Sequence, residues 1–165
     1  MKKLISTLFL ILIVMSCSTK KDNSEKNVAI IENYIQAVED LDYETMSALL
    51  DDEYIGIGPS YGDTIRKTNA VKNWKWNAEN LYDSIDYTES KSAPIVISTG
   101  KNQGEWVSNW AQTNITYKNN NETVIIWSNS IYQIVNDKIV KSYTFYNEAD
   151  ALEQLGYTFI NFNDF

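Results

Sequence analysis

Histidine, cysteine and arginine are scarce: the 165 residues include no histidine, one cysteine and one arginine. Without histidine, a Ser-His triad, a histidine general base and the commonest metal ligand are all excluded. The single cysteine, Cys17, excludes an intramolecular disulfide and a zinc site built on thiolates. The one acidic cluster, Asp51-Asp52-Glu53, is more typical of a solvated helix end than of a metal site. We therefore expect no cofactor and no metal.

Positive charge is also scarce. The formal net charge is -8, Arg66 is the one arginine, and the lysines are scattered among acidic residues. Binding to a phosphate backbone requires clustered lysine and arginine side chains. The sequence therefore predicts no nucleic-acid partner and no attraction of the folded domain to anionic lipid.

One long hydrophobic run is present, at the start of the chain. Lys2 and Lys3 precede the apolar stretch from Leu4 to Met15, which is 12 residues long and is followed by Ser16 and Cys17. A membrane-spanning helix needs about 20 apolar residues, so this run has the length of a secretory signal. We interpret residues 1–16 as a bacterial lipoprotein signal peptide and Cys17 as the acylated residue. An ordinary cleaved signal and an uncleaved anchor remain as alternatives.

This interpretation predicts a location. The mature protein would be anchored to a membrane of the bacterial cell envelope through the lipid on Cys17, facing the periplasm or the cell surface. Residues 18–27 contain no apolar side chain, so residues 17–27 are predicted to form a flexible tether. Residues 28–165 have the length of one domain with a single core.

The first part of this domain has helical periodicity. Val28, Ile31, Ile35 and Val38 recur at helical spacing, which predicts an amphipathic helix over 28–40. A second, short helix is expected to follow, capped by Asp42. Residues 54–57 then read as a short strand, and residues 68–82 as a third helix with Trp74, rather than Trp76, on its inner side.

The second part is typical of long strands. Five segments rich in β-branched and aromatic residues are predicted strands: 84–90, 93–99, 105–117, 123–135 and 138–146. Turn-forming residues separate them, among them Asn119-Asn120-Asn121 and Asn136-Asp137. Helices followed by antiparallel strands indicate an α+β domain, in which a curved sheet wraps around three N-terminal helices as a cone.

This order of elements resembles the nuclear transport factor 2-like superfamily, and in particular its SnoaL-like and ketosteroid isomerase-like members. Three local matches carry the resemblance: residues 34–39 with Asp42 and Met46, residues 137–140, and residues 146–150 with 154–156. The resemblance covers about residues 28 to 160. The superfamily contains isomerases, cyclases, dehydratases and proteins without catalysis, so it implies a fold rather than a reaction.

The resemblance also implies site residues. The ketosteroid isomerase-like pattern places an oxyanion-binding tyrosine at Tyr34 and its partner at Asn129 or Ser130, because the strand register is open by one residue. The position of the family's catalytic base falls on Gly58, before Pro59, where no side chain can accept a proton. Asp52, Asp63, Asp86 and Asp150 remain as non-standard carboxylates, and for Asp150 a helix cap is the simpler interpretation.

Aromatic residues are abundant, with five tryptophans and eleven tyrosines. Indole rings beside small polar groups can stack on a flat ligand, although they can equally fill a core or a dimer contact. We expect no assigned catalytic residue and a ligand site formed by Tyr34, Trp74, Trp110, Asn129 and Ser130. The expected function is binding of a small apolar or aromatic ligand. The alternatives are a proton-transfer enzyme using Tyr34 and a non-standard carboxylate, and a homodimer or envelope interaction module.

Overall fold

The computed structural model describes residues 23–161, so the predicted signal peptide and Cys17 lie outside the described residues. Its helices are α2 (Ser24–Glu39), α3 (Tyr43–Leu49), α4 (Lys67–Asn80) and α5 (Glu148–Gln154), and its strands are β1 (Leu50–Ile57), β2 (Thr64–Arg66), β3 (Tyr82–Ile97), β4 (Gly104–Tyr117), β5 (Thr123–Val135) and β6 (Lys138–Tyr146). Within this part of the chain, no helix is both long and apolar enough to cross a bilayer.

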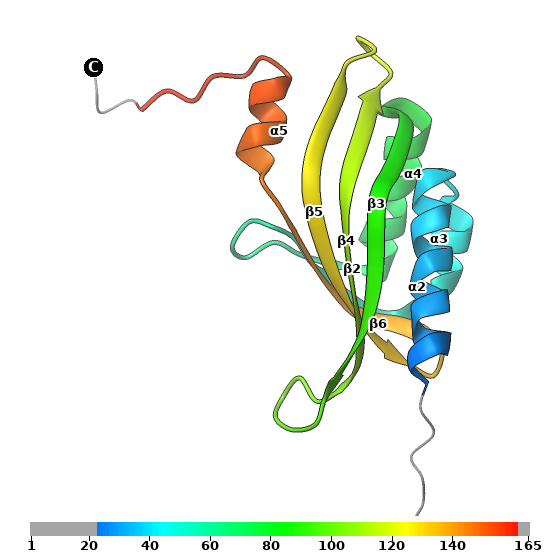
Figure 1. The fold of residues 1–165 in the computed structure, drawn as a ribbon. Coiled ribbons are helices and arrows are strands. Elements are labelled where there is room, and N and C mark those ends of the chain that lie inside the picture. Colours follow the sequence, from blue (N-terminus) through cyan, green and yellow to red (C-terminus); the bar gives the residue numbers. More distant parts are fainter. Residues whose placement is uncertain (1–22, 162–165) are drawn as a thin grey trace, which may run out of the picture.

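The six strands form one curved sheet in the order β2-β1-β6-β5-β4-β3. In Figure 1, α2, α3 and α4 lie together on one side of the long strands. The predicted α+β cone is confirmed, with one correction: β1 pairs with β6 in parallel, so the sheet is mixed rather than wholly antiparallel. The pairs β3–β4, β4–β5 and β5–β6 are antiparallel hairpins. Strand β1 is far from β6 in the sequence, so local turn chemistry does not reveal that the two strands pair.

The first helix begins at Ser24, inside the segment predicted to be a tether. Asn27 is buried although it is polar, because its Nδ2 donates a hydrogen bond to Glu105 Oε2 at 2.8 Å. Asn23 Nδ2 donates to the same carboxylate at 3.3 Å. The tether was predicted because residues 18–27 have no apolar side chain. Asn23 and Asn27 nevertheless pack against the sheet, because both side-chain amides donate hydrogen bonds to the Glu105 carboxylate on β4.

The predicted apolar face of the first helix packs on the concave face of the sheet. Ile31, Ile35 and Val38 on α2 are buried, and Met46 on α3 joins the same core. The side chain of Asp42 caps α3 by accepting hydrogen bonds from the backbone N–H groups of Glu44 and Thr45, as predicted. These contacts hold α2 against β3 and β4, and α3 against α2 and β1, on the side of the sheet where the candidate site lies.

The strands differ from the prediction in three places. Strand β1 begins at Leu50 rather than at residue 54, and β2 was not predicted. The third difference concerns β3. Segments 84–90 and 93–99 are one continuous strand, β3, whose register with β4 shifts between Thr88 and Lys91. Glu89 in this interval has a φ of 52°, as expected at an irregularity that bends a strand. The Asn-rich turns behave as predicted, since Asn121, Asn136 and Asp137 adopt positive φ angles of 57°, 51° and 65°.

Candidate functional site

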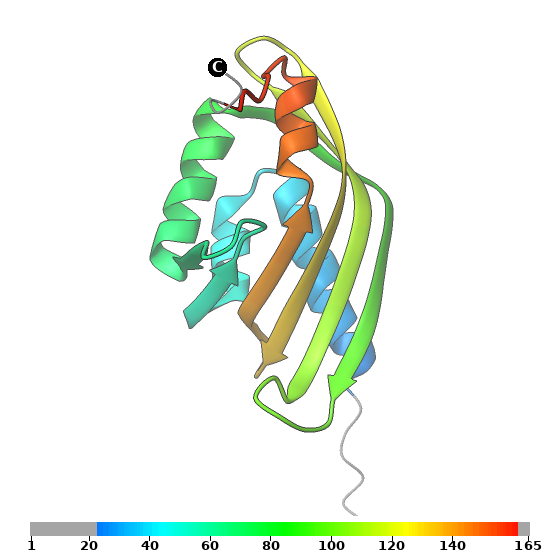
Figure 2. The same ribbon diagram turned by 90° about the vertical axis from the view of Figure 1, so that its left-hand side faces the viewer.

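A cavity of about 450 Å³ lies between the concave face of the sheet and the helices α4 and α5. Figure 2 shows these two helices at the same end of the molecule, beside the strands. Their contributions to the lining are Trp74 and Asn77 from α4, and Glu148, Ala151 and Leu152 from α5, with Leu155 directly after α5. The volume falls in the range of small-molecule sites, which is about 300–1,000 Å³.

The floor of the cavity is made by alternate residues of the long strands. Along β5 these are Val124, Ile126, Ser128, Ser130 and Tyr132, so the even-numbered side chains face inward. On β4 the odd-numbered residues Thr113, Ile115 and Tyr117 face inward, because the register pairs an odd residue of β4 with an even residue of β5.

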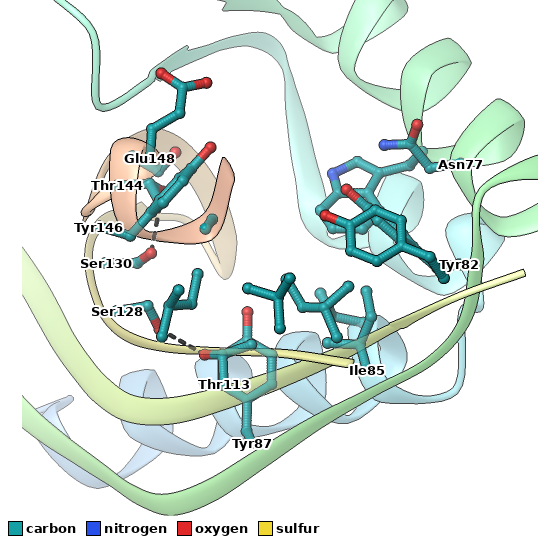
Figure 3. Close-up of a pocket in the computed structure, with 18 of the residues that line it drawn as sticks. Asn77, Tyr82, Ile85, Tyr87, Thr113, Ser128, Ser130, Thr144, Tyr146 and Glu148 are labelled. Carbon is teal, nitrogen blue, oxygen red and sulfur yellow. Dashed lines mark hydrogen bonds between the residues drawn. The ribbon is translucent and has the colours of Figure 1, made fainter. Parts of the chain in front are cut away.

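Five small hydroxyl side chains form a band across this floor, here called the hydroxyl band: Thr113, Ser128, Ser130, Ser142 and Thr144. Thr113 Oγ1 and Ser128 Oγ are 2.7 Å apart, and Ser130 Oγ and Thr144 Oγ1 are 3.0 Å apart. Both pairs are drawn as dashed lines in Figure 3. Because either oxygen of each pair can donate, the band can meet a ligand group that donates or one that accepts a hydrogen bond.

Seven tyrosines line the same cavity: Tyr34, Tyr54, Tyr82, Tyr87, Tyr117, Tyr132 and Tyr146. The rings of Tyr34 and Tyr132 meet edge to face, with their centroids 5.7 Å apart. Burial raises the pKa of Tyr82 and of Tyr87 to about 12, with the negative charge of Glu39 adding to the effect at Tyr87. Burial also raises the pKa of Tyr34 well above its usual value. These phenols therefore stay neutral hydrogen-bonding groups at physiological pH.

Charge is nearly absent from the lining. Glu148 contributes its one carboxylate, and this residue is exposed and accepts a hydrogen bond from Ser60 Oγ at 3.1 Å. Asp52, which is ion-paired with Lys67 Nζ at 2.8 Å, is not part of the lining. The same holds for the other non-standard carboxylates suggested by the sequence: Asp63, Asp86 and Asp150. Among residues 23–161, no group of three carboxylate, cysteine or histidine side chains is arranged to hold a metal ion.

The structure brings together three of the five predicted site residues. Tyr34, Trp74 and Ser130 line the cavity, and Trp76 on the same helix is exposed. The placement of Trp110 and Asn129 is corrected: they are register partners on the opposite, convex face. The residue one step along β5 from Asn129 is Ser130, so the one-residue ambiguity in register decided which of them faces inward.

Asn129 instead has a structural role on the convex face. Its Nδ2 donates hydrogen bonds to Ser108 Oγ at 3.0 Å and to the backbone oxygen of Asn109 at 2.9 Å. This amide therefore ties β5 to β4 outside the cavity.

Other lining residues were not foreseen from the sequence. Thr113, Ser128, Thr144 and the α5 residues gave no individual signal, because serine and threonine are ordinary in exposed strands. Alternation along β5 from Ser130 would have identified Ser128, and the hairpin register would then have identified Thr113 and Thr144.

The C-terminal helix closes one side of the cavity. Asn147, rather than Asp150, caps α5, since Asn147 Oδ1 accepts a hydrogen bond from the backbone N–H of Asp150. Gln154 then fastens the helix to β5: Ile125 N–H donates to its Oε1, and its Nε2 donates to the Ile125 oxygen, both at 2.9 Å. This part of β5 extends beyond the residues that pair with β6, so the Gln154 amide takes the place of a strand partner.

No family model matches the chain, and no curated protein matches it in sequence. An LEH-like epoxide hydrolase from M. tuberculosis superposes with a TM-score of 0.63 at 12% identity, covering 82% of this chain and 89% of that one. A candidate polyketide cyclase from Xanthomonas campestris pv. campestris gives a TM-score of 0.66 at 12% identity, with 81% and 99% covered.

A third solved structure belongs to a protein described as NTF2-like. An NTF2-like protein from Burkholderia xenovorans LB400 superposes with a TM-score of 0.59 at 17% identity, covering 79% of this chain and 96% of that one. At these identities the likeness concerns architecture and not chemistry. The chain therefore has the nuclear transport factor 2-like fold.

Proposed function

We propose that this protein is an exported lipoprotein whose cone binds a small, uncharged, flat ligand carrying a hydroxyl or carbonyl group. The observation that carries the proposal is the hydroxyl band inside a largely aromatic lining. Trp74 and the tyrosines supply flat apolar surface for a ring system, and the band supplies hydrogen bonds for one polar group on it.

The charge of the lining supports an uncharged ligand. A buried anion would need a cationic partner, and the lining contains no lysine or arginine. A buried cation would meet only Glu148, which is exposed and already accepts a hydrogen bond from Ser60. Similarity in fold to a candidate polyketide cyclase and to an epoxide hydrolase is compatible with a cavity for small organic molecules. Binding requires no group beyond those in the lining, whereas proton transfer would require Glu148 as the base.

Three probes of one shape test this proposal: 2-naphthol, naphthalene and 2-naphthoate, titrated calorimetrically at neutral pH. We expect 2-naphthol to bind roughly 10-fold more tightly than naphthalene, because a net hydrogen bond contributes about 1–1.5 kcal/mol. We expect 2-naphthoate to bind most weakly, since its carboxylate would lose water without gaining a cation. If none of the three binds, the proposal is wrong. Equal affinity for all three would show that the hydroxyl band does not contribute to binding.

A pair of double variants locates the binding. In Ser130→Ala/Thr144→Val, the preference for 2-naphthol over naphthalene should fall, because one of the two hydroxyl pairs of the cavity is gone. The matched control is Thr116→Val/Thr123→Val, which removes a hydroxyl pair of similar geometry, 2.9 Å apart, on the convex face of the sheet. The control should retain the preference.

The lipid anchor is a separate part of the proposal, and it rests on the sequence of residues 1–17. When the full chain is produced in a Gram-negative host with labelled palmitate, we expect the label to enter the protein and the protein to fractionate with membranes. Cys17→Ser should lose both, because serine offers no thiol for acylation. Incorporation that persists in Cys17→Ser would refute the assignment of Cys17.

A further inference from the structure

A second, smaller pocket of about 250 Å³, here called the outer pocket, lies beside the main cavity. It is formed by the residue after α4, the turn between β4 and β5, and the residues after α5, which lie at the same end of the molecule in Figure 1. Tyr117 and Leu155 line both pockets, so the two share a wall. The other lining residues of the outer pocket are Leu81, Asn119, Asn120, Glu122, Gly156 and Tyr157.

Hydrogen bonds hold the walls of the outer pocket in place. Lys118 Nζ donates to two backbone oxygens in the last turn of α4, at 2.8 and 3.1 Å, and so ties the β4–β5 turn to that helix. Gly156, with a φ of 82°, ends α5, and the following N–H, of Tyr157, donates to the Leu152 oxygen at 3.0 Å. The backbone of Tyr157 is thereby fixed beside the pocket. The frame of the pocket is therefore formed before a ligand arrives.

The side chains of the outer pocket suit a neutral group with several hydroxyls. Among residues 23–161 the Asn119 side chain has no hydrogen-bond partner, and its amide can both donate and accept. Glu122 Oε2 accepts a hydrogen bond from Asn120 Nδ2, which leaves Oε1 open to a donor on a ligand. The exposed ring of Tyr157 offers a flat apolar face. Neighbouring hydroxyls of a sugar match the amide and the carboxylate, and its C–H face matches the ring.

Polarity changes in a regular order along the strand that joins the two pockets. The hydroxyl band reaches β5 at Ser128 and Ser130, and Ile126 and Val124 follow toward the turn as an apolar section. The outer pocket begins in the turn before Thr123, the first residue of β5. Thr123 lies five residues from Ser128, which is about 17 Å along an extended strand. A two-ring ligand held at the hydroxyl band is shorter than this distance, whereas one with a sugar at its far end reaches the outer pocket.

We infer that the ligand is an amphiphile whose flat ring system lies in the cone and whose neutral sugar lies in the outer pocket. This inference rests on the proposed ligand site and adds a second site of different chemistry to it. The hydroxyl band holds a polar group at the inner end of the rings, and Asn119, Glu122 and Tyr157 hold the sugar. Because the two parts are covalently joined, the sugar meets its pocket at a high effective concentration once the rings are bound.

Three ligands on one scaffold test the inference by calorimetric titration at neutral pH: 2,6-dihydroxynaphthalene, its mono-β-D-glucoside and its mono-β-D-glucuronide. We expect the glucoside to bind roughly 10-fold more tightly than the diol, because the sugar gains a net hydrogen bond and a ring contact. The glucuronide should lose this gain, since its carboxylate would approach that of Glu122. Glu122→Gln should bring the affinity for the glucuronide up to that for the glucoside.

The variant Tyr157→Ala locates the sugar. It should lose the gain of the glucoside and keep the affinity for the diol, because Tyr157 lines the outer pocket and not the cavity. Tyr61→Ala is the matched control, since Tyr61 is fully exposed and lines neither pocket, and it should retain the gain.

Two results would overturn the inference and leave the proposed ligand site standing. One is a diol that binds as tightly as its glucoside, and the other is a Tyr61→Ala variant that loses the gain as Tyr157→Ala does. If none of the three ligands binds, the proposed ligand site fails as well.

Discussion

Replacing Ile31 by alanine is expected to lower the free energy of unfolding by about 2–5 kcal/mol. Ile31 has no exposed surface and lies in the core between α2 and the sheet. Its truncation removes apolar contacts and leaves a cavity that the rigid helix and the long strands cannot fill. Because Tyr34 on α2 lines the ligand cavity, we expect the wall of the cavity to become less well ordered as the protein loses stability.

Urea unfolding measures this loss by linear extrapolation. Asn33→Ala is the control, since Asn33 is exposed on the same helix, and it should change stability by no more than about 0.5 kcal/mol. A loss below about 1 kcal/mol for Ile31→Ala would mean that the packing of α2 on the sheet contributes far less than its burial indicates.

Between about pH 10 and 12 the protein is expected to unfold, because burial holds the pKa of Tyr82 and Tyr87 at about 12. In the unfolded chain a tyrosine loses its proton near pH 10. Below pH 10 both states are protonated and the stabilisation is complete. As the pH rises through this window, the unfolded state binds fewer protons than the folded state, so stability falls. Tyr34 and Tyr132, whose pKa values burial also raises, add to the same trend.

Tyrosinate absorbance and near-ultraviolet circular dichroism, recorded together during an alkaline titration, measure this transition. We expect part of the tyrosinate signal to appear cooperatively with the loss of tertiary structure. Tyr87→Phe should shift the midpoint to higher pH, because one phenol that opposes folding at alkaline pH is gone. Tyr61→Phe, which alters a fully exposed ring, should leave the midpoint unchanged. Complete ionisation near pH 10 in a still folded protein would contradict the prediction.

Local chemistry made much of the fold predictable. The spacing of Ile31, Ile35 and Val38 predicted the buried face of α2, and Asp42 predicted the start of α3. The turn at Asn136 and Asp137 predicted the last hairpin, because these residues tolerate positive φ angles. Such features depend on neighbours within a few positions, which a sequence displays directly.

The boundaries that failed depend on distant partners. The start of α2 at Ser24 requires Glu105, which follows Asn27 by 78 residues, to accept the hydrogen bond of its side chain. The continuity of β3 requires the whole of β4 as a template, with a register shift that absorbs Glu89. Neither requirement has a local signature. Periodicity alone therefore predicted that the first helix begins at residue 28, and that β3 is two separate strands.

The candidate site was only partly predictable for a related reason. The superfamily resemblance pointed to Tyr34, and helical spacing placed Trp74 inward. The choice between Asn129 and Ser130, and with it the place of Trp110, depended on which face of β5 meets the helices. A shift of one residue reverses every side chain of a strand, and both faces of β4 and β5 are rich in aromatic and hydroxyl residues.

The sequence by itself determined most of the order of helices and strands, with β2 missed and β3 divided in two. It also determined the amphipathic faces of the helices, the turns, and the low charge of the central strands, because each follows from local propensity and periodicity. Tertiary structure alone decided which strand face encloses the cavity, how Thr113, Ser128, Ser130 and Thr144 meet as a hydroxyl band, and how α5 closes the side of the cone. These features arise where strands and helices distant in the chain pack together, and long-range register, which no local pattern encodes, sets their contacts.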